Sequence, residues 1–371
     1  MSGLRVACVC GQSGAVSGLA PVLQKGRRGG WHIRVLSYGE AIAAFRHENI
    51  SVELCEQSFS ENDAILWLKE AAPEVVLLGT DAARHVEKRV VRAAKALGIP
   101  SVMYVDFWSN YSSRFEDDKG RTVPDVVAVL DAEMETRLQT CGIDRGKLHI
   151  TGSPALEKAS LIADIDPTKV CSLRIAAGLP KECVCVLFVS SPSYINYVSG
   201  SVSEDRHNSV LNPIMELASA LDSCKELWNR KVYLVVRPHP REDVSAFNEI
   251  RFGNIRIRVE KEGTGLDWIA HSDLVVGLDT MLLVEAMMAR RPVLCLAYSR
   301  PLIPAVSNIA KSMGVLVCEK ENLLSAMSQM FSADSTGLVD NTSIQQILFS
   351  GATQRMIALV TEITERYKQR K

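Results

Sequence analysis

The sequence predicts an α/β protein with two Rossmann-like domains built on parallel sheets, and three observations support this class. Short apolar runs alternate with helix-like segments from one end of the chain to the other. The alternation is interrupted at Gly152-Ser153-Pro154 and starts again at a strongly apolar run over residues 183–189. A length of 371 residues also exceeds what one ordinary hydrophobic core organises, so two domains are expected.

The interruption divides the chain into the predicted parts. We expect a first domain over residues 1–151, a connector over 152–181 and a second domain over 182–343. Apolar residues recur at helical spacing over residues 344–371. This segment is predicted to be a helix that packs back on the first domain, and ordinary helical packing elsewhere is the alternative.

Strands are predicted where aliphatic and β-branched residues form short runs. In the first domain these runs are 5–10, 32–36, 75–78, 101–105, 126–130 and 148–151, and in the second they are 183–189, 231–236, 255–259, 274–276, 292–296 and 315–318. Helices are predicted at 64–71, 85–97, 155–162, 170–177, 212–228 and 280–289. Strands that alternate with helices in this way are typical of a parallel sheet covered on both faces.

Composition excludes several classes of protein. Lys and Arg (42) nearly balance Asp and Glu (43), so no global basic field favours nucleic acid as a partner. No apolar run reaches the roughly 18 residues of a membrane span, and no signal peptide is visible. The ten cysteines lie largely in apolar runs and form no Cys-x-x-Cys pair, which indicates free thiols in the reducing cytoplasm.

The most informative stretch runs from residue 267 to residue 296. An apolar strand ends at Gly277, Asp279 and Thr280 follow, and a helix begins at once. A helix N-terminus at a strand end presents unpaired N–H groups and a positive dipole end, which bind phosphate. Glu285 lies about one and a half turns into this helix, where a carboxylate can accept hydrogen bonds from both hydroxyls of a ribose. A nucleotide site is therefore predicted, with a plain N-cap at Thr280 and a solvated Glu285 as the alternative.

A basic and proline-rich segment follows the strand 231–236. Arg237, His239 and Arg241 alternate there with prolines, and guanidinium groups beside an imidazole suit a phosphate or diphosphate leaving group. His239 can donate a hydrogen bond or a proton to that phosphate, although it can also simply cap the strand end. Serines that follow the strand 183–189 offer hydroxyl and N–H groups at the equivalent sheet edge: Ser190, Ser191 and Ser193.

The first domain lacks the signature of a redox cofactor. Its first strand is followed by Gly11, Gly14 and Gly18, whose spacing differs from G-x-G-x-x-G, and no acid ends the second strand. A nicotinamide or flavin cofactor is therefore not expected. Gly14 is predicted to let a sugar or the reactive end of a donor approach the backbone. The histidines are scattered and the acidic clusters lack partners at ligand spacing, so no metal site is predicted.

Two carboxylates end neighbouring strands of the first domain. Asp81 follows the strand 75–78, and Asp106 follows the strand 101–105. Phe107, Trp108 and Tyr111 come next to Asp106, so we expect them to shield it from water and to stack on a pyranose ring. Either aspartate can act as a general base, and either can instead be a helix cap.

These residues resemble the GT-B superfamily, which includes UDP-N-acetylglucosamine 2-epimerases and nucleotide-sugar glycosyltransferases. The stretch Gly277–Pro292 resembles the donor-binding turn and helix of that superfamily, which implies Thr280 on the diphosphate and Glu285 on the ribose. The segment Arg237–Arg241 resembles the His-Pro element of bacterial sialyltransferases and polyol-phosphate transferases, which implies phosphate binding by His239. Weaker matches to the epimerases are Gly79-Thr80-Asp81 to their Gly-Asp-Thr, Tyr104-Val105-Asp106 to their His-x-Glu, and, into the connector, Pro124-Asp125, Leu130-Asp131, Cys141-Gly142-Ile143 and Thr151-Gly152-Ser153-Pro154.

The sequence also departs from the epimerases at two places. Their catalytic His follows the first strand of the second domain, and this chain has Ser190-Ser191-Pro192 there. Their Glu-Glu pair in the donor helix is reduced to Val284-Glu285. Sugar transfer is therefore favoured over epimerisation.

The resulting prediction is a cytoplasmic, metal-independent glycosyltransferase that uses a UDP- or CMP-linked sugar as substrate and needs no further cofactor. Asp106, or else Asp81, deprotonates an acceptor held by the first domain, which is a sugar, a lipid-linked molecule or a small molecule. His239, Arg237 and Thr280 stabilise the departing phosphate from the second domain, across an interdomain cleft. The alternatives are a nucleotide-sugar 2-epimerase or hydrolase and a non-catalytic sugar-nucleotide-binding subunit. The oligomeric state stays open, with a homodimer among the options.

Overall fold

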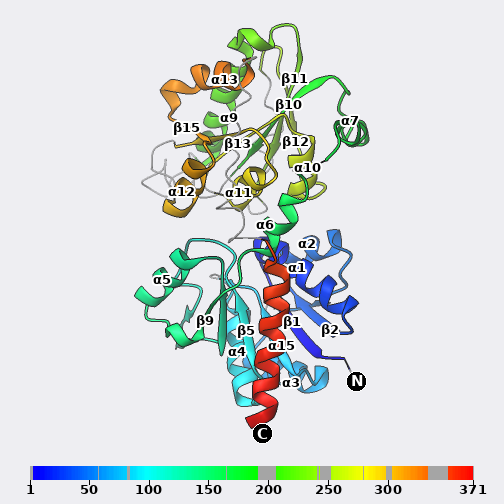
Figure 1. Cartoon of the computed structure of the whole chain (residues 1–371), viewed down its shortest axis with the longest axis vertical. Coiled ribbons are helices and arrows are strands. Elements are labelled where there is room, and N and C mark those ends of the chain that lie inside the picture. The colour runs from blue at the N-terminus through cyan, green and yellow to red at the C-terminus, as the bar shows by residue number, and fades with distance from the viewer. Residues whose placement is uncertain are drawn as a thin grey trace. The chain divides into compact units, whose positions relative to one another are not determined.

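Two compact units divide the chain in the computed structural model, and both are α/β structures with a parallel sheet (Figure 1). The first unit comprises residues 1–158 and 343–371, and the second comprises residues 159–342. The structure describes residues 3–56, 58–81, 84–163, 165–190, 206–239, 242, 252–278, 280–297, 303–332 and 350–370, without the side chains of 167 and 206–212.

The first unit contains a seven-stranded parallel sheet. Its strands, in spatial order, are β3 (Glu53–Leu54), β2 (His32–Ser37), β1 (Arg5–Cys10), β4 (Val75–Leu78), β5 (Ser101–Tyr104), β8 (Val126–Val129) and β9 (Leu148–Ile150). The chain builds outward from β1 to β3 and then returns to the other side of β1 to form β4. The strand order therefore reverses between β1 and β4, and ligands of such sheets bind outside the carboxyl ends of the strands at this point.

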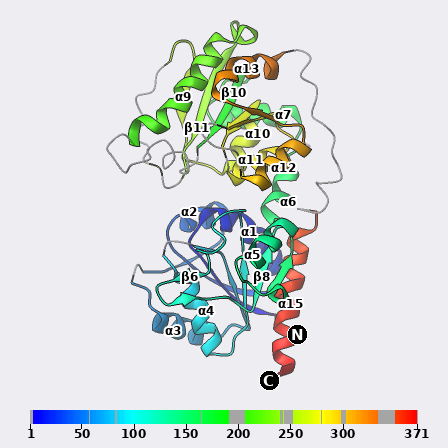
Figure 2. The ribbon, with the colours of Figure 1, turned by 90° about the vertical axis from the view of Figure 1, so that its left-hand side faces the viewer.

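Helices cover both faces of this sheet (Figures 1 and 2). Helix α1 contacts α2 and α15, whereas α3 packs against α4. The helices of this unit are α1 (Ser13–Arg28), α2 (Ala41–His47), α3 (Glu61–Ala71), α4 (Val86–Ala96), α5 (Ala132–Thr140), α6 (Pro154–Ser160) and α15 (Ala352–Arg370), with a short turn η1 (Arg145–Lys147). A small hairpin, β6 (Glu116–Asp117) and β7 (Gly120–Arg121), follows β5 in the chain.

The second unit repeats this plan with a six-stranded parallel sheet. Its strands, in spatial order, are β12 (Arg256–Val259), β11 (Lys231–Arg237), β10 (Cys183–Val189), β13 (Leu274–Gly277), β14 (Val293–Leu296) and β15 (Leu316–Cys318). Every residue of β10 is buried, as expected for a central strand of a parallel sheet that is covered on both faces. The strand order reverses between β10 and β13.

The helices of the second unit also form two groups. Helices α9 and α13 contact each other and complete one hydrophobic core with the strands, whereas α10 contacts α7 and α11. The helices are α7 (Pro167–Ala176), α9 (Arg206–Ser223), α10 (Gly265–His271), α11 (Met281–Met288), α12 (Pro304–Ser312) and α13 (Leu323–Phe331), with short turns η2 (Lys225–Leu227) and η4 (Lys320–Asn322).

The structure confirms the predicted fold class, and every strand predicted from the sequence is present within a residue or two of its expected ends. The prediction did not include α1, because Gly14, Gly18, Gly26 and Pro21 all lower helix propensity in that segment. The predicted connector is shared between the units, since α6 begins in the first and α7 contacts α10 in the second. Helix α15 lies in the first unit and contacts α1.

Candidate functional site

The carboxyl edge of the second sheet brings three predicted segments into one row. Val189 at the end of β10 lies in register with Arg237 of β11 on one side and with Gly277 of β13 on the other. Adjacent strands are about 4.8 Å apart, so the ends of β11 and β13 are separated by about 10 Å. Ser190, His239 and Thr280 follow these strands directly. The topology therefore places them at the same edge, at the point where the strand order reverses.

Thr280 is the N-cap of α11. Its Oγ1 atom accepts a hydrogen bond of 3.2 Å from the backbone N–H of Leu283, which is the plain capping role given above as the alternative. Phosphate binding by Thr280 stays a prediction. Glu285 lies further along this helix, and its carboxylate-bearing side chain is buried in a helix whose other residues are apolar. Its contact with a ribose also stays a prediction.

Gly277 has a packing role. A Cβ atom at this position would lie 2.3 Å from Cγ2 of Val189 and 3.0 Å from its carbonyl oxygen. Only glycine therefore allows β13 to pack against β10 at this level of the sheet. This packing accounts for the glycine without a ligand, and approach of a phosphate to its backbone stays a prediction.

Glu242 connects the ends of β10 and β11, and the sequence predictions missed it. Its Oε1 atom accepts a hydrogen bond of 2.7 Å from the Ser190 hydroxyl, and its Oε2 atom accepts one of 2.6 Å from the His239 backbone N–H. Glu242 is 5% exposed, and burial raises the pKa of its carboxyl. The side chain thus fixes the segment that carries His239. The one signal in the sequence is a glutamate placed three residues after His239.

Arg237 does not present its guanidinium freely to a ligand. Its Nη1 atom donates to the carbonyls of Glu260 at 3.1 Å and Glu262 at 2.6 Å, and its Nη2 atom donates to Gly263 at 2.7 Å. These contacts tie the end of β11 to the loop that follows β12. The expected contact of Arg237 with phosphate stays a prediction. The remaining predicted residues of this edge, Ser191, Ser193, Arg241 and Asp279, lie outside the described residues.

In the first unit, Asp106 is held by Arg114 and Thr80. The Arg114 Nη1 atom lies 2.7 Å from Oδ1 of Asp106, and the Thr80 hydroxyl donates to the same oxygen at 3.3 Å. Arg114 also donates to the Thr80 hydroxyl. A Cβ atom at Gly14 would lie 2.6 Å from Oδ2 of Asp106, so this carboxylate packs directly against the start of α1. The sequence gave no indication of Arg114, because eight residues separate it from its partner.

The aromatic residues near Asp106 do not all face a ligand. Trp108 is 2% exposed, and its Nε1 atom donates to Oδ2 of Asp131 at 2.8 Å. The rings of Phe107 and Trp108 contact each other edge to face, 5.7 Å between centroids. The expectation that Trp108 stacks on a pyranose is therefore wrong, because its ring belongs to the core.

Asp81 is buried in a hydrogen-bonded cluster. It is 3% exposed and accepts from Gln12 Nε2 at 3.2 Å, the Tyr38 hydroxyl at 2.9 Å and the Arg84 backbone N–H at 3.2 Å. These three donors and the burial leave the Asp81 carboxylate less accessible to an acceptor substrate than a carboxylate at the surface. Asp106 is therefore the better candidate for the base, and a catalytic role of Asp81 stays a prediction.

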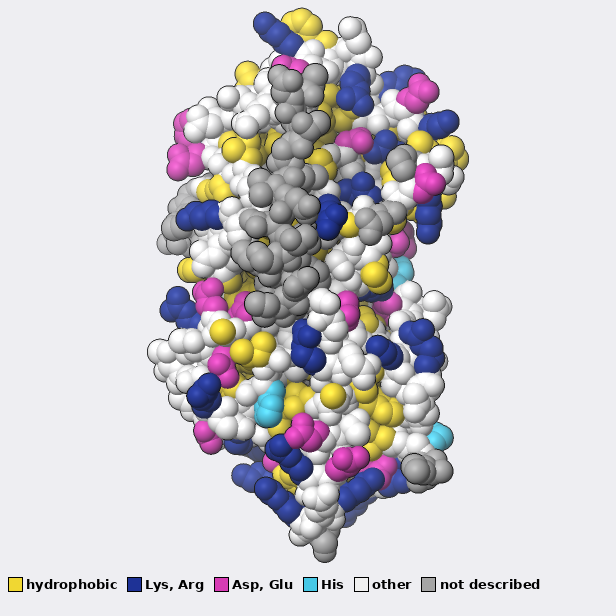
Figure 3. Space-filling view, in the orientation of Figure 1, with side chains coloured by type: hydrophobic (Ala, Val, Ile, Leu, Met, Phe, Trp, Pro, Cys, Tyr) yellow, Lys and Arg dark blue, Asp and Glu magenta, His cyan; other side chains and the backbone are white. Residues whose placement is uncertain are grey.

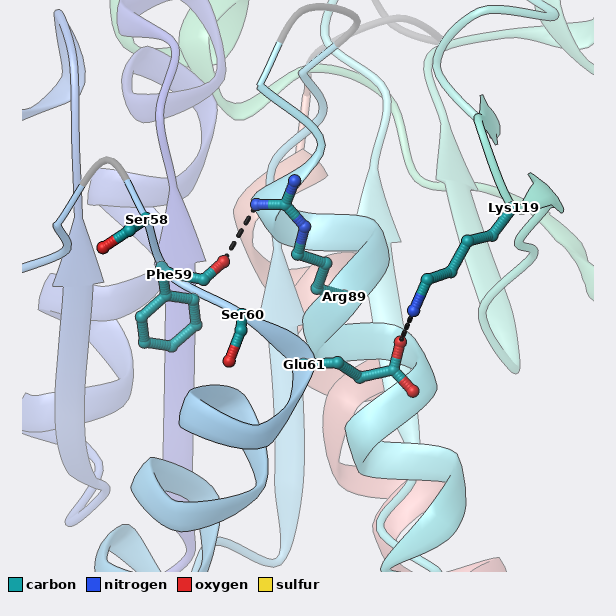
Figure 4. Close-up of a pocket in the computed structure, with 6 residues that line it drawn as sticks. All are labelled: Ser58, Phe59, Ser60, Glu61, Arg89 and Lys119. Carbon is teal, nitrogen blue, oxygen red and sulfur yellow. Dashed lines mark hydrogen bonds and ion pairs between the residues drawn. The ribbon is translucent and has the colours of Figure 1, made fainter.

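The first unit also contains a cavity in a different place. A cavity of about 260 Å³ lies at the start of α3, and Figure 4 shows its lining residues, Ser58, Phe59, Ser60, Glu61, Arg89 and Lys119. Both of its cations already have partners. Arg89 donates to the carbonyl of Phe59 at 2.9 Å, and Lys119 lies 3.2 Å from Glu61. The cavity is lined by none of the predicted residues, so it is not assigned to the candidate site.

Four general properties of the described residues bear on the kind of site. The face of the molecule in Figure 3 shows Lys and Arg side chains interspersed with Asp and Glu. Within the described ranges, no three His, Cys, Asp or Glu side chains gather in a way that could hold a metal ion. Among the described helices, none has both the length and the apolar character that crossing a bilayer requires. All ten cysteines are free thiols.

Comparison with solved structures places the fold. No protein-family model matches the chain, and no curated protein sequence matches it. UDP-GlcNAc 2-epimerase from Methanocaldococcus jannaschii has a TM-score of 0.68 at 12% identity, and the comparison covers 97% of this chain and 100% of that one. UDP-GlcNAc 2-epimerase from Neisseria meningitidis, bound to UDP-GlcNAc, has a TM-score of 0.67 at 14% identity over the same shares.

A glycosyltransferase is among the similar structures as well. The enzyme from Rickettsia africae has a TM-score of 0.57 at 14% identity, and the comparison covers 98% of each chain. Epimerases and glycosyltransferases with these two Rossmann-like domains share one architecture, and the similarity extends over nearly the whole chain. The chain therefore has the fold of the GT-B superfamily.

Proposed function

We propose that this protein is a glycosyltransferase that transfers a sugar from a nucleotide-sugar donor to an acceptor hydroxyl without a metal ion. The GT-B fold supports the class of substrate, since similar structures include one bound to UDP-GlcNAc. The ten free thiols fit the reducing cytoplasm. UDP and CMP are the proposed nucleotides, and the acceptor is a sugar, a lipid-linked molecule or a small molecule.

The second unit supplies the site for the donor. The start of α11 offers backbone N–H groups to the diphosphate, with Thr280 at its N-cap and Glu285 toward the ribose. His239 follows the neighbouring strand, and its backbone is fixed by Glu242. An imidazole on this fixed backbone can donate a hydrogen bond or a proton to the departing phosphate. The proposed leaving-group stabilisation therefore comes from α11 and His239.

The first unit supplies the base. The hydrogen bonds and the ion pair described for Asp106 all go to Oδ1, from Arg114 and Thr80. Its Oδ2 atom lies at the start of α1, beside Gly14. Oδ2 is therefore the atom that we propose to accept the proton of the acceptor hydroxyl, while Arg114 keeps the carboxylate in place.

One observation favours transfer over epimerisation. Ser190 follows β10, where the resemblance to the epimerases requires a catalytic His, and its hydroxyl is bonded to Glu242. A hydroxyl in this position cannot replace an imidazole as an acid or base near neutral pH. Loss of that group removes the chemistry of epimerisation and leaves the donor site in place.

The test starts with binding and continues with turnover. Thermal unfolding is measured with a panel of nucleotides and nucleotide sugars, because a ligand that binds the native state raises the melting temperature. The donor that stabilises the protein is then incubated with candidate acceptors, and the glycosylated product is detected by mass spectrometry. A panel that gives no stabilisation would contradict the proposed donor site.

A 2-epimerase is the second candidate, because the epimerases from Neisseria meningitidis and Methanocaldococcus jannaschii have higher TM-scores than the glycosyltransferase from Rickettsia africae. Incubation with UDP-GlcNAc in the absence of an acceptor separates the two reactions. A 2-epimer would favour epimerisation, and free UDP alone would favour hydrolysis. Tight nucleotide binding without any turnover would instead favour a non-catalytic sugar-nucleotide-binding subunit.

A further inference from the structure

Beneath the turn between β1 and α1, two buried carboxyl groups meet at a single tyrosine hydroxyl. The Tyr38 hydroxyl lies 2.9 Å from Oδ2 of Asp81 and also contacts Oε2 of Glu87. Tyr38 and Asp81 are 3% exposed and Glu87 is 1% exposed, so water does not screen the three groups. None of them was assigned a role in the reaction proposed above.

The number of protons in this group follows from its geometry. A tyrosine hydroxyl has one hydrogen and can donate it to only one carboxylate. The second contact is a hydrogen bond only if the other carboxyl is protonated and donates to the tyrosine oxygen. Two ionised carboxylates at these distances would leave one of them buried against an oxygen lone pair, which is strongly unfavourable. The geometry therefore requires one extra proton on the pair Asp81 and Glu87.

The surrounding charges are consistent with a single negative charge. Lys88 is completely buried on α4, and its amino group donates to the carbonyl of Asp81 at 2.9 Å and lies 3.0 Å from Nδ1 of His85. The guanidinium of Arg84 lies 5.7 Å from the centre of the Tyr38 ring. Burial raises the pKa of the thiols that face Glu87 from β1 and from the segment after β3, so these groups stay neutral: Cys8, Cys10 and Cys55.

The cluster of Tyr38, Asp81 and Glu87 also holds the turn between β1 and α1, which lies next to the proposed base. Oε1 of Glu87 accepts a hydrogen bond of 3.1 Å from the backbone N–H of Gly11. Three residues later, Gly14 packs against Oδ2 of Asp106. On the other side, Thr80 precedes Asp81 in the chain and donates to Oδ1 of Asp106. Asp106 is thus held on both sides by segments that Glu87 and Asp81 anchor.

We propose that Asp81 and Glu87 share one proton through the Tyr38 hydroxyl, and that Glu87, as a neutral acid, is a positioning residue for Asp106. The positioning role rests on the proposed function, because it concerns the base of that reaction. Loss of the shared proton puts a second negative charge under the Gly11–Gly14 turn and breaks one of the two bonds to Tyr38. The turn, and with it the site of Asp106, then loses its support.

The pH at which this happens follows from burial. Burial raises the pKa of Glu87 to about 7, with Asp81 adding to the effect and the bonds from Tyr38 and Gly11 opposing it. A carboxyl whose pKa is higher in the folded than in the unfolded protein stabilises the fold at low pH. That stabilisation is lost as pH rises from the unfolded value of 4.5 to about 7. The positioning of Asp106 is therefore expected to fail on the alkaline side of neutrality.

The variant Glu87→Gln tests the proton directly. A glutamine amide can accept from Gly11 and donate to Tyr38, so it reproduces the neutral acid and cannot ionise. Between pH 5 and pH 8 the melting temperature of the wild type should fall relative to that of the variant. The infrared carbonyl band of a protonated acid should be present in the wild type at pH 6 and missing in Glu87→Gln. The exposed Glu70→Gln is the control and should behave as the wild type. Identical pH dependence and identical spectra of the wild type and Glu87→Gln would overturn the shared proton.

Kinetics tests the positioning role separately. The wild-type kcat for sugar transfer should fall by about tenfold per pH unit above the pKa of Glu87, with an unchanged KM for the donor. Glu87→Gln should keep its kcat over the same range. Equal alkaline profiles would overturn the positioning role while sugar transfer stands. An infrared and stability signature without any sugar transfer would instead overturn the proposed function and leave the shared proton in place.

Discussion

The two units carry the same strand reversal at their carboxyl edges, between β1 and β4 in the first and between β10 and β13 in the second. The groups at the two edges differ. The first edge holds buried ionisable side chains, with Asp81, Glu87 and Lys88 in one cluster and Asp106 paired with Arg114. The second edge holds a helix N-terminus and backbone N–H groups. The topology is thus common to both units, while the side chains at the two edges differ, and this difference is the basis of the proposed division into proton transfer and phosphate binding.

The two edges also share one structural feature, a buried glutamate. In each unit a buried glutamate bonds both to the end of the first strand and to the end of the second. Glu87 contacts Gly11 and Tyr38, and Glu242 contacts Ser190 and His239. Glu242 faces two donors and has no second carboxyl among its described contacts. The proton sharing is therefore specific to the first unit.

Replacing the proposed base should give the largest effect. Asp106→Asn is expected to lower kcat for sugar transfer by about 10²–10⁴-fold, because an amide cannot accept the proton. The nucleotide should stabilise the variant as it does the wild type, since the donor site belongs to the second unit. Steady-state kinetics and thermal shift measure the two properties.

The exposed Asp118→Asn in the same unit is the matched control and should keep its activity. Equal activity of Asp106→Asn and the wild type would remove the assignment of proton transfer to the first unit.

A methyl group at Gly277 tests the packing of the second edge. Gly277→Ala should lower the free energy of unfolding by about 1–3 kcal/mol, because its Cβ would overlap Val189. Urea denaturation gives this value. Gly146→Ala is the control, since a Cβ there would lie 3.6 Å from the nearest side-chain atom, in ordinary contact, and little change is expected. A Gly277→Ala variant as stable as the wild type would show that β13 can move away from β10.

Removing the cap of α11 should have a smaller effect on stability and a specific one on binding. Thr280→Ala is expected to cost about 1 kcal/mol of folding free energy through loss of the cap, and to weaken nucleotide binding as well. Thr264→Ala removes the N-cap of α10 in the same unit and should cost similar stability without affecting the nucleotide. Isothermal titration calorimetry measures the nucleotide affinity of the two variants and so distinguishes their effects. Equal affinities of the two variants would leave Thr280 with a capping role alone.

The smallest expected effect concerns acid stability. His271 of α10 is buried, and neither ring nitrogen has a hydrogen-bond partner in the structure. Burial lowers the pKa of its imidazole, with Arg174 and Arg291 adding to the effect and Asp267 opposing it. The unfolded chain then binds the proton more readily, so stability is lost as pH falls below the ordinary value of 6.5. His271→Leu should reduce this loss in melting curves between pH 7 and pH 5.

This acid-side loss in the second unit is the opposite of the alkaline-side loss expected from Glu87 in the first. Should His271→Leu show the same pH dependence as the wild type, the buried imidazole is protonated in the native protein, and the contrast between the units disappears.

The sheets could be predicted because each central strand is a short run of apolar residues, such as Cys183–Val189. A run of this length and composition is typical of a strand that is buried on both faces of a sheet. The location of the site at the strand ends follows from the parallel topology. Helix α1 could not be predicted by propensity, because its glycines make room for other side chains, such as Asp106 beside Gly14 and Tyr104 beside Gly18. A Cβ at Gly18 would lie 2.3 Å from the Tyr104 ring.

The partners in the site could not be predicted for a related reason. Arg114 and Glu87 act through contacts made in the folded chain, and nothing in their local sequence distinguishes them from solvated charges. For Glu242 the one local signal is its place three residues after His239. Arg237 has contacts of the same kind, since its guanidinium bonds three backbone carbonyls, while its expected contact with phosphate stays a prediction. The type of a residue and its position after a strand therefore predict a candidate site. The hydrogen-bond partners in the folded chain are needed to assign a role to each residue within it.

The return of α15 to the first unit has a consequence for synthesis of the protein. Glu157 accepts hydrogen bonds from the backbone N–H groups of Gly351 and Thr353, both at 2.8 Å, and the whole second unit lies between these partners in the sequence. Helix α15 contacts α1, so the side of α1 that α15 covers stays exposed during synthesis while residues 159–342 are translated. A chain stopped near residue 340 would expose that surface permanently, so premature termination should produce aggregates or a chaperone substrate instead of a usable half.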